Sequence, residues 1–153
     1  MIEKLELLGT AIASLHSKLI LLVGSQSTGK TSLLKAFGKR VEAEPLNVGS
    51  QLGLRLAGLS QKQRPIEAIS LLRELADQYA KDDLLLLDNI EILFDRSLQL
   101  DPLDLLKRQA QVRRVVAVWP GELHDGRLTY AVMGHPEHQD YGIDGFVPFE
   151  VQQ

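Results

Sequence analysis

One octapeptide constrains this chain more than any other segment. Gly24 to Thr31 reads Gly-Ser-Gln-Ser-Thr-Gly-Lys-Thr, which matches the Walker A pattern G-x-x-x-x-G-K-[ST]. The apolar run before it, Leu19–Val23, predicts a buried strand, and the segment from Ser32 to Phe37 predicts the start of a helix. A strand, a glycine-rich loop and a helix in this order form the setting in which the pattern holds phosphate. The alternative is a glycine-rich turn that exposes a lysine.

The fixed residues of this loop each have a chemical task. Gly24 and Gly29 let the backbone curl so that successive N–H groups point at one anion, and the following helix adds the positive end of its dipole. Lys30 supplies a point charge for the β- and γ-phosphates, and the Thr31 hydroxyl is a ligand for a bridging magnesium ion. The residues expected around a nucleotide are Gly24, Ser25, Gln26, Ser27, Thr28, Gly29, Lys30, Thr31 and Ser32.

Apolar runs alternate with amphipathic segments along the rest of the chain. The expected elements are a helix over 1–17, a strand over 19–23, a helix to about residue 40, a short strand over 45–48, an irregular loop over 49–53, a helix from 65 to about 81, a strand over 84–87, a helix over 101–113 and strands over 115–119 and 128–133. Residues 134–153 are expected to be mostly irregular, with a short strand near 146–149.

This order of elements is typical of one fold class. Continuous apolar strands that alternate with amphipathic helices indicate a parallel sheet covered on both faces. We therefore predict a three-layer α/β/α sandwich of the P-loop NTPase type. The 153 residues suit a single domain over 1–153 and leave no room for a helical lid.

A second motif lies where four leucines, Leu84 to Leu87, end at Asp88. Four apolar residues followed by an acid form the Walker B pattern. Its carboxylate leaves the carboxyl end of a buried strand, expected beside the strand that feeds the loop, where open α/β sheets bind ligands. Asp88 is then expected to hold magnesium together with Thr31. The competing interpretation is a helix cap, because the residues after Asp88 are able to open a helical turn.

The residues after Asp88 leave the hydrolytic machinery incomplete. Many ATPases with an additional strand place Glu directly after the Walker B acid, but this chain has Asn89, which positions water without accepting its proton. Glu91 is the best remaining carboxylate, and the alternative for it is a solvent-facing turn residue. The expected catalytic residues are Lys30, Asp88 and Glu91.

Two further groups of residues are less specific. The charge that develops on a γ-phosphate is often met by an arginine of a neighbouring subunit, and the sequence offers Arg96, Arg113, Arg114 and Arg127 without preferring one. A polar sensor commonly ends the strand after Walker B, whereas this strand ends at Trp119 and Pro120. Trp119 is expected in the core or over the sheet end, with stacking on adenine as the alternative. Hydrolysis is therefore expected to be slow or dependent on a partner.

Composition argues against several classes of partner and of chemistry. A net charge of −3 argues against a large nucleic-acid footprint, although Lys107, Arg108, Arg113 and Arg114 offer a basic strip for DNA. The absence of cysteine excludes disulfides and thiol catalysis. Neither a signal peptide nor a run of ~18 apolar residues is present, so we expect a cytoplasmic protein without membrane contact.

One histidine motif has to be weighed as a metal site. His135 and His138 form H-x-x-H with Asp140 close by. Pro136 between the two histidines argues against a helix that presents both rings together, and a metal needs three or more convergent ligands. A solvated loop is the preferred interpretation.

The two phosphate-site motifs together resemble the AAA+ and STAND-like ATPase cores, over residues 1 to about 133. A tighter resemblance is to BrxF, a small P-loop family of type 3 bacteriophage-exclusion (BREX) systems, which begins with a helix before the loop. It is carried by Asp88-Asn89, by Val-Trp-Pro-Gly at 118–121 and by Gly-His-Pro at 134–136. The resemblance implies anti-phage defence beside a methyltransferase, a phosphatase-like protein and a helicase. The two phosphate-site motifs predict ATP and Mg²⁺ as cofactors.

The leading hypothesis is therefore a magnesium-dependent ATPase subunit that acts through homo-oligomerisation or protein partners. The alternative is a nucleotide-dependent switch or scaffold with little turnover, which Asn89 and Trp119 favour. A small-molecule kinase is a third class, but the sequence shows neither an arginine-rich lid nor an acceptor site.

Overall fold

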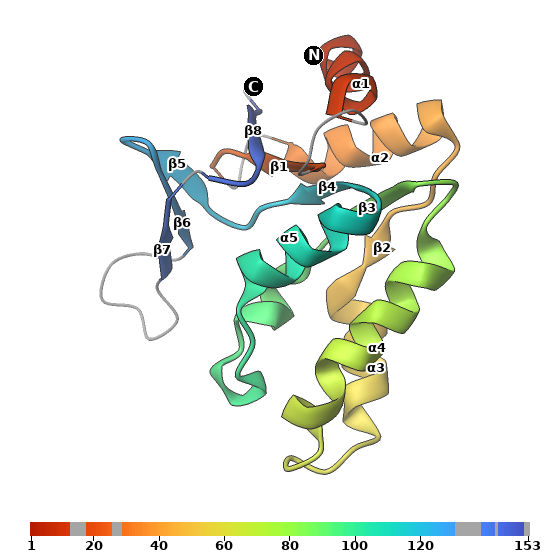
Figure 1. Cartoon of the computed structure of the whole chain (residues 1–153), viewed down its shortest axis with the longest axis vertical. Coiled ribbons are helices and arrows are strands. Elements are labelled where there is room, and N and C mark those ends of the chain that lie inside the picture. The colour runs from red at the N-terminus through yellow and green to blue at the C-terminus, as the bar shows by residue number, and fades with distance from the viewer. Residues whose placement is uncertain (13–17, 26–28, 131–138, 143, 152–153) are drawn as a thin grey trace.

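The computed structural model describes residues 1–12, 18–25, 29–130, 139–142 and 144–151, without the side chains of 139 and 140. Its main sheet has five parallel strands in the order β2-β3-β4-β1-β8 (Figure 1). These strands are β1 (Leu19–Val23), β2 (Leu46–Asn47), β3 (Leu84–Asp88), β4 (Arg114–Val118) and β8 (Val147–Glu150). The helices are α1 (Ile2–Ala11), α2 (Lys30–Val41), α3 (Val48–Ala57), α4 (Arg64–Tyr79) and α5 (Pro102–Val112), with 3-10 helices η3 (Ile90–Phe94) and η4 (Arg96–Leu98).

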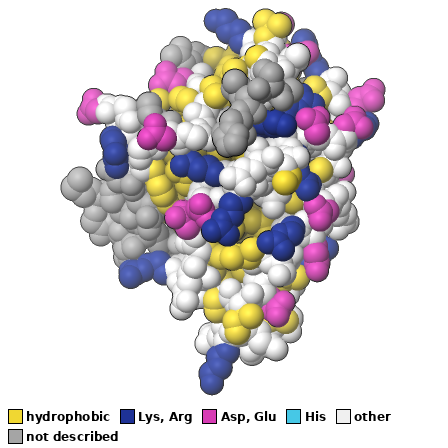
Figure 2. All heavy atoms as spheres, in the orientation of Figure 1, with side chains coloured by type: hydrophobic (Ala, Val, Ile, Leu, Met, Phe, Trp, Pro, Cys, Tyr) yellow, Lys and Arg dark blue, Asp and Glu magenta, His cyan; other side chains and the backbone are white. Residues whose placement is uncertain are grey.

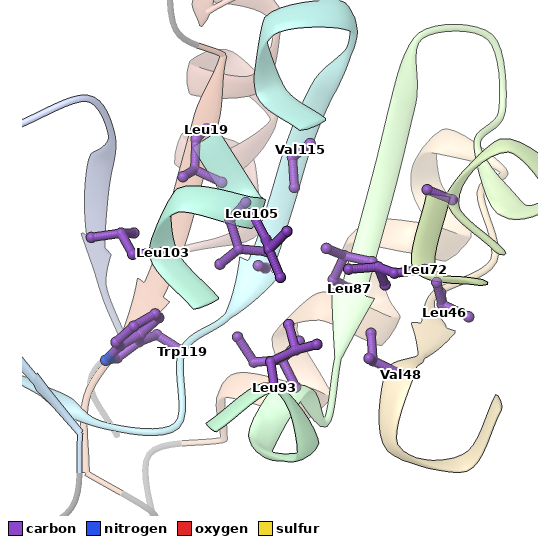
Figure 3. Packing of buried hydrophobic residues seen from close by; sticks show 14 of the residues in the cluster. Leu19, Leu46, Val48, Leu72, Leu87, Leu93, Leu103, Leu105, Val115 and Trp119 are labelled. Atoms are coloured by element: carbon purple, nitrogen blue, oxygen red, sulfur yellow. The ribbon is translucent and has the colours of Figure 1, made fainter. Parts of the chain in front are cut away.

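The helices cover both faces of this sheet, as predicted. Helices α1 and α2 lie on one face, and α3, α4 and α5 lie on the other (Figure 1). Because successive strand residues point to opposite faces, Leu19 and Leu21 of β1 pack toward α5, whereas Ile20 and Leu22 pack toward α2. Figure 3 shows the first of these cores, to which both Leu19 of β1 and Leu105 of α5 belong. The three-layer α/β/α architecture is confirmed.

Local signals set several element boundaries where the sequence predicts them. Pro65 lies in the first turn of α4, where its missing N–H has no intrahelical partner to lose. Asp101 caps α5, and its side chain accepts a hydrogen bond of 3.2 Å from the backbone N–H of Asp104. Strand β3 ends at Asp88. Helix α1 ends at Ala11, and the expected continuation over 13–17 lies outside the described residues.

The predicted irregular loop over 49–53 is wrong, because these residues belong to α3. Asn47 caps this helix by accepting a hydrogen bond of 3.0 Å from the N–H of Ser50, and Val48, Leu52 and Leu56 form its buried stripe. Two glycines in the segment pointed to a loop, but tertiary packing outweighs their low helix propensity.

The chain after β4 forms a second sheet that the sequence analysis did not predict. Strands β5 (Glu122–His124), β6 (Arg127–Tyr130) and β7 (Gln139–Tyr141) pair antiparallel in that order. Residues 128–130 of the strand predicted over 128–133 belong to β6, which is not part of the parallel sheet, and residues 131–133 lie outside the described residues. Asp125 and Gly126, with φ of 50° and 74°, connect β5 to β6 in the manner of a two-residue hairpin turn.

The C-terminal segment forms an edge strand of the main sheet. The short strand expected near residues 146–149 is β8, which pairs with β1 and places Phe149 opposite Leu22. Among the described residues, the segment after β4 forms these strands and no helical lid.

Arg114, at the amino end of β4, connects α1 with the residue before β3. The Arg114 guanidinium donates to both carboxylate oxygens of Asp83 at 2.7 and 2.9 Å and to the carbonyl of Gly9 at 3.1 Å. The hydrogen bonds from Arg114 hold the pKa of the Asp83 carboxyl below its usual value. The contribution of this pair to stability is therefore present at neutral pH and is lost as the pH falls through that lowered pKa.

We expect Asp83→Asn to lower the free energy of unfolding by about 0.5–1 kcal/mol at pH 7, as for other solvent-accessible pairs. The difference from wild type should vanish in acid, where the wild-type carboxyl is also neutral. Urea unfolding at both pH values measures this, with Glu44→Gln as an exposed control. An equal loss of stability at both pH values would show that the charge of Asp83 is not responsible.

Candidate functional site

The glycines at the two ends of the loop adopt backbone conformations that side chains disfavour. Gly24 has φ of 146°, and Gly29, which caps α2, has φ of 81°. A side chain at Gly29 would be strained by this φ, although the added Cβ has open space around it among the described residues beyond its chain neighbours and the backbone of α2. The predicted loop residues Gln26, Ser27 and Thr28 lie outside the described residues.

The first turn of α2 meets the end of β3. The Thr31 hydroxyl donates a hydrogen bond of 3.1 Å to Oδ1 of Asp88, and the same oxygen accepts from the N–H of Asn89 at 2.8 Å. Both side chains offer oxygen, which is the ligand type that magnesium prefers. The structure thus brings together the two residues that the sequence assigns to the metal.

The strand order behind this contact differs from the one expected. Strand β4 lies between β3 and β1, so Asp88 is not on a strand beside the one that feeds the loop. Helix α2 begins after β1 and packs over β4 and β3, and this brings Thr31 to the end of β3. The contact therefore depends on a crossover that no local pattern reports.

Lys30 is buried, with only 7% of its surface exposed. Its Nζ donates to the carbonyl oxygens of Gly24 at 2.8 Å, Trp119 at 2.7 Å and Gly121 at 3.4 Å. Burial lowers the pKa of the Lys30 ammonium, and the negative charges of Glu122 and Glu91 oppose that shift. Glu122 is thus a carboxylate near the site that sequence reasoning missed.

Asn89 is fixed in a left-handed conformation at the end of β3, with φ of 52°. Its Nδ2 donates to Oδ1 of Asn47 at 2.9 Å, and its carbonyl accepts from the N–H of Gly49 at 2.9 Å. A Cβ at Gly49 would lie 2.5 Å from that Nδ2, so only glycine allows α3 to approach this closely. The side chain of Asn89 is therefore held in one place.

A single pocket of about 620 Å³ contains most of these groups. This volume lies within the usual range of ~300–1,000 Å³ for small-molecule sites. Glu91, from the exposed side of η3, reaches the same pocket as Lys30, Thr31 and Asp88. The lining residues are Lys30, Thr31, Lys35, Asn47, Asp88, Asn89, Glu91, Val118, Pro120 and Tyr130.

Three of these lining residues had no role in the sequence analysis. Lys35 follows Thr31 by one helical turn, so helical spacing was a signal that could have found it. Asn47 ends β2 at the carboxyl edge of the sheet, and its register opposite Asp88 requires the strand pairing to be known. Tyr130 reaches the pocket from the second sheet, which no motif reports.

Trp119 belongs to the core and is fully buried. Its Nε1 donates to the carbonyl of Thr129 at 2.9 Å, and its ring meets the rings of Phe94 and Tyr141 edge-on at 5.3 and 5.6 Å. The alternative of stacking on adenine does not fit this position. Figure 3 shows Trp119 at the end of the same core that contains Leu103.

The candidate arginines divide into two pairs. Arg113 and Arg114 lie at the amino end of β4, opposite the sheet edge that carries Asp88, and they bind Asp77 at 2.6 Å and Asp83 at 2.7 Å. Arg96 lies in η4 and Arg127 in β6.

The basic strip considered for DNA is largely neutralised. Arg113 and Arg114 form ion pairs with Asp77 and Asp83, and Arg108 forms a third ion pair, with Asp104, at 2.8 Å. Figure 2 accordingly shows basic side chains beside acidic ones on this face.

Two remaining expectations concern other kinds of site. His135 and His138 lie outside the described residues, as does the side chain of Asp140, so the H-x-x-H interpretation is not addressed. Elsewhere in the described chain no cluster of three or more acidic or histidine side chains forms a metal site. None of the helices in the described ranges combines the length and the apolar character that a membrane crossing requires.

Comparison with known proteins finds similarity to solved structures only. No model of a known protein family matches the chain, and no curated protein matches it. A solved structure of PCH-2 from C. elegans is similar over 99% of this chain and 42% of its own length, with 17% identity and a TM-score of 0.53. A DNA replication initiation factor matches over 98% of this chain and 45% of its own length, with 19% identity and a TM-score of 0.46, and we draw nothing from it. The chain thus spans less than half the length of either protein, and the likeness to PCH-2 supports the α/β fold alone.

Proposed function

We propose that this chain binds ATP with magnesium at the junction of α2 and β3 and hydrolyses it, acting as a homo-oligomer or with protein partners. One observation carries the proposal: Thr31 Oγ1 lies 3.1 Å from Asp88 Oδ1, so the two motifs expected to share a metal meet in space. Lys30 stands in the same pocket and supplies the positive charge that phosphates require.

The roles follow from the chemistry of each group. The N–H groups at the start of α2 and the Lys30 ammonium bind phosphate oxygens. Thr31 and Asp88 would hold magnesium, which neutralises phosphate charge when bound. Glu91 and Asn89 line the pocket, where the Asn89 amide orients a water and the Glu91 carboxylate accepts its proton as the water oxygen attacks the γ-phosphorus. ADP then leaves with the bridging oxygen.

The role of Glu91 can be tested by isosteric replacement. We expect Glu91→Gln to lower ATP turnover by about 10²-fold or more, the range for loss of a general base, with ATP affinity little changed. Phosphate release at several protein concentrations measures turnover, and the exposed Glu44→Gln is the matched control. Turnover equal to wild type in Glu91→Gln would remove Glu91 from the mechanism.

A nucleotide-dependent switch is the second candidate function. It is favoured by Asn89, which replaces the acid that commonly follows Walker B and which Asn47 and Gly49 hold in place. A switch binds ATP, shows little turnover in every variant, and changes its mass in solution with ATP and magnesium. Phosphate release distinguishes it from the proposed ATPase, because a switch binds ATP tightly and its low turnover is the same in wild type and in Glu91→Gln.

For the biological role we infer anti-phage defence in the cytoplasm beside other BREX proteins. The support is the resemblance at Asp88-Asn89, 118–121 and 134–136. In a host that carries such a system, we expect Lys30→Ala to abolish protection in phage plating assays. Full protection by a stably produced Lys30→Ala protein would contradict this role for the nucleotide site.

A further inference from the structure

The hydrogen bonds of Lys30 link the phosphate loop to a distant part of the chain. An ammonium group has three N–H donors, and Nζ of Lys30 lies at hydrogen-bond distance from three backbone carbonyl oxygens. One carbonyl, that of Gly24, belongs to the loop itself. The other two belong to residues 119–121, which connect β4 to β5 and are called the β4–β5 turn below. Two of the three carbonyl partners of Lys30 therefore come from the segment that follows β4, about 90 residues after the loop in the chain.

The β4–β5 turn is fixed on both sides. The N–H of Trp119 donates to the carbonyl of Leu22 at 2.9 Å, which ties the turn to β1. The Trp119 indole donates to the carbonyl of Thr129, and the Thr129 hydroxyl donates to the carbonyl of Glu122 at 3.2 Å. At Gly121 an added Cβ would lie 1.8 Å from the Thr129 carbonyl oxygen. The turn is thus packed directly onto β6.

A phosphate oxygen and these carbonyls compete for the same donors. Because all three N–H groups of Lys30 are engaged, a hydrogen bond to phosphate requires Lys30 to release at least one carbonyl. The bond to Gly121, at 3.4 Å, is the longest of the three and the weakest by geometry. Release of this carbonyl leaves Trp119 and Gly24 bound and removes the hydrogen bond between Lys30 and the residue that precedes β5.

We propose that the β4–β5 turn is a positioning element for Lys30 and that phosphate binding, by displacing the Gly121 carbonyl, transmits nucleotide occupancy to the sheet β5-β6-β7. This inference rests on the proposed function, because it requires a nucleotide at the loop. Glu122, the first residue of β5, adds a second link, since its negative charge acts on Lys30.

Hydrogen exchange on the wild-type protein tests the proposal directly. With saturating MgATP, we expect exchange at residues 121–124 to become about fivefold faster, the factor for losing one hydrogen bond, while α4 stays unchanged. Emission from Trp119, the only tryptophan of the chain, should shift in the same titration. Calorimetry on the same sample reports binding. Bound nucleotide with unchanged or slower exchange at 121–124 overturns the proposal, whereas no binding at all overturns the proposed function instead.

A variant separates positioning from a merely structural role. Gly121→Ala forces the turn away from Thr129 and so removes a competitor for Lys30, and we expect it to bind ATP about fivefold more tightly. Structural damage alone would not raise affinity. Gly53→Ala is the matched control, because its Cβ meets only Ile92 Cδ1, at 3.8 Å. A folded Gly121→Ala protein with unchanged or weaker affinity contradicts the proposal, and the wild-type exchange experiment decides if that variant does not fold.

Discussion

Replacement of Lys30 by methionine is expected to weaken MgATP binding by about 100-fold or more, which corresponds to about 3 kcal/mol for loss of a buried, charge-assisted contact. Methionine keeps much of the length and the apolar stem of lysine, so α2 should still pack. The loss then reports the ammonium group, which is the buried cation of the pocket. Calorimetric titration measures the affinity of each protein.

The matched control for this variant is Lys39→Met in the last turn of the same helix. Lys39 is exposed and does not line the pocket, so its loss should leave ATP affinity within about twofold of wild type, as for other surface changes. Similar losses in the two variants would mean that Lys30 acts only through net charge. Circular dichroism checks that both proteins are folded.

The second large effect is expected on stability. Trp119→Ala should lower the free energy of unfolding by about 3–5 kcal/mol, the usual range for a fully buried aromatic residue. The indole joins three elements, since it contacts Phe94 of η3 and Tyr141 of β7 and donates to Thr129 of β6. Its removal leaves a cavity and takes away the indole N–H that the Thr129 carbonyl accepts.

Urea unfolding followed by far-UV circular dichroism measures this loss without the tryptophan signal. Leu54→Ala is the control, because Leu54 is 73% exposed, and it should change stability by less than about 0.5 kcal/mol. A loss of less than about 1 kcal/mol in the free energy of unfolding of Trp119→Ala would contradict the placement of Trp119 as a fully buried residue in contact with both sheets.

The parts that the sequence predicts well are those fixed by neighbouring residues. The strand β1 before the loop, the helix α2 after it and the strand that ends at Asp88 follow from short patterns, and the starts of α4 and α5 follow from Pro65 and Asp101. Alternating strands and helices are sufficient to indicate a covered parallel sheet. The three-layer fold could therefore be predicted without coordinates.

The parts that the sequence misses depend on contacts between distant residues. Helix α3 forms over Gly49 and Gly53 because its apolar stripe packs on the sheet, which no propensity reveals. Within residues 122–141 the sequence predicts one strand, over 128–133, but its antiparallel pairing with β5 and β7 depends on contacts that no local pattern encodes. The carbonyl partners of Lys30 are backbone atoms, and no side-chain motif encodes them.

The most direct test of a magnesium-nucleotide site is calorimetric titration of the wild-type protein with ATP, first with Mg²⁺ and then with EDTA. We expect saturable binding of one ATP per chain with Mg²⁺ and clearly weaker binding with EDTA, because the Thr31 and Asp88 oxygens stand where the metal joins them to phosphate. No saturable binding up to millimolar ATP, or equal affinity with and without Mg²⁺, would contradict the assignment of this site.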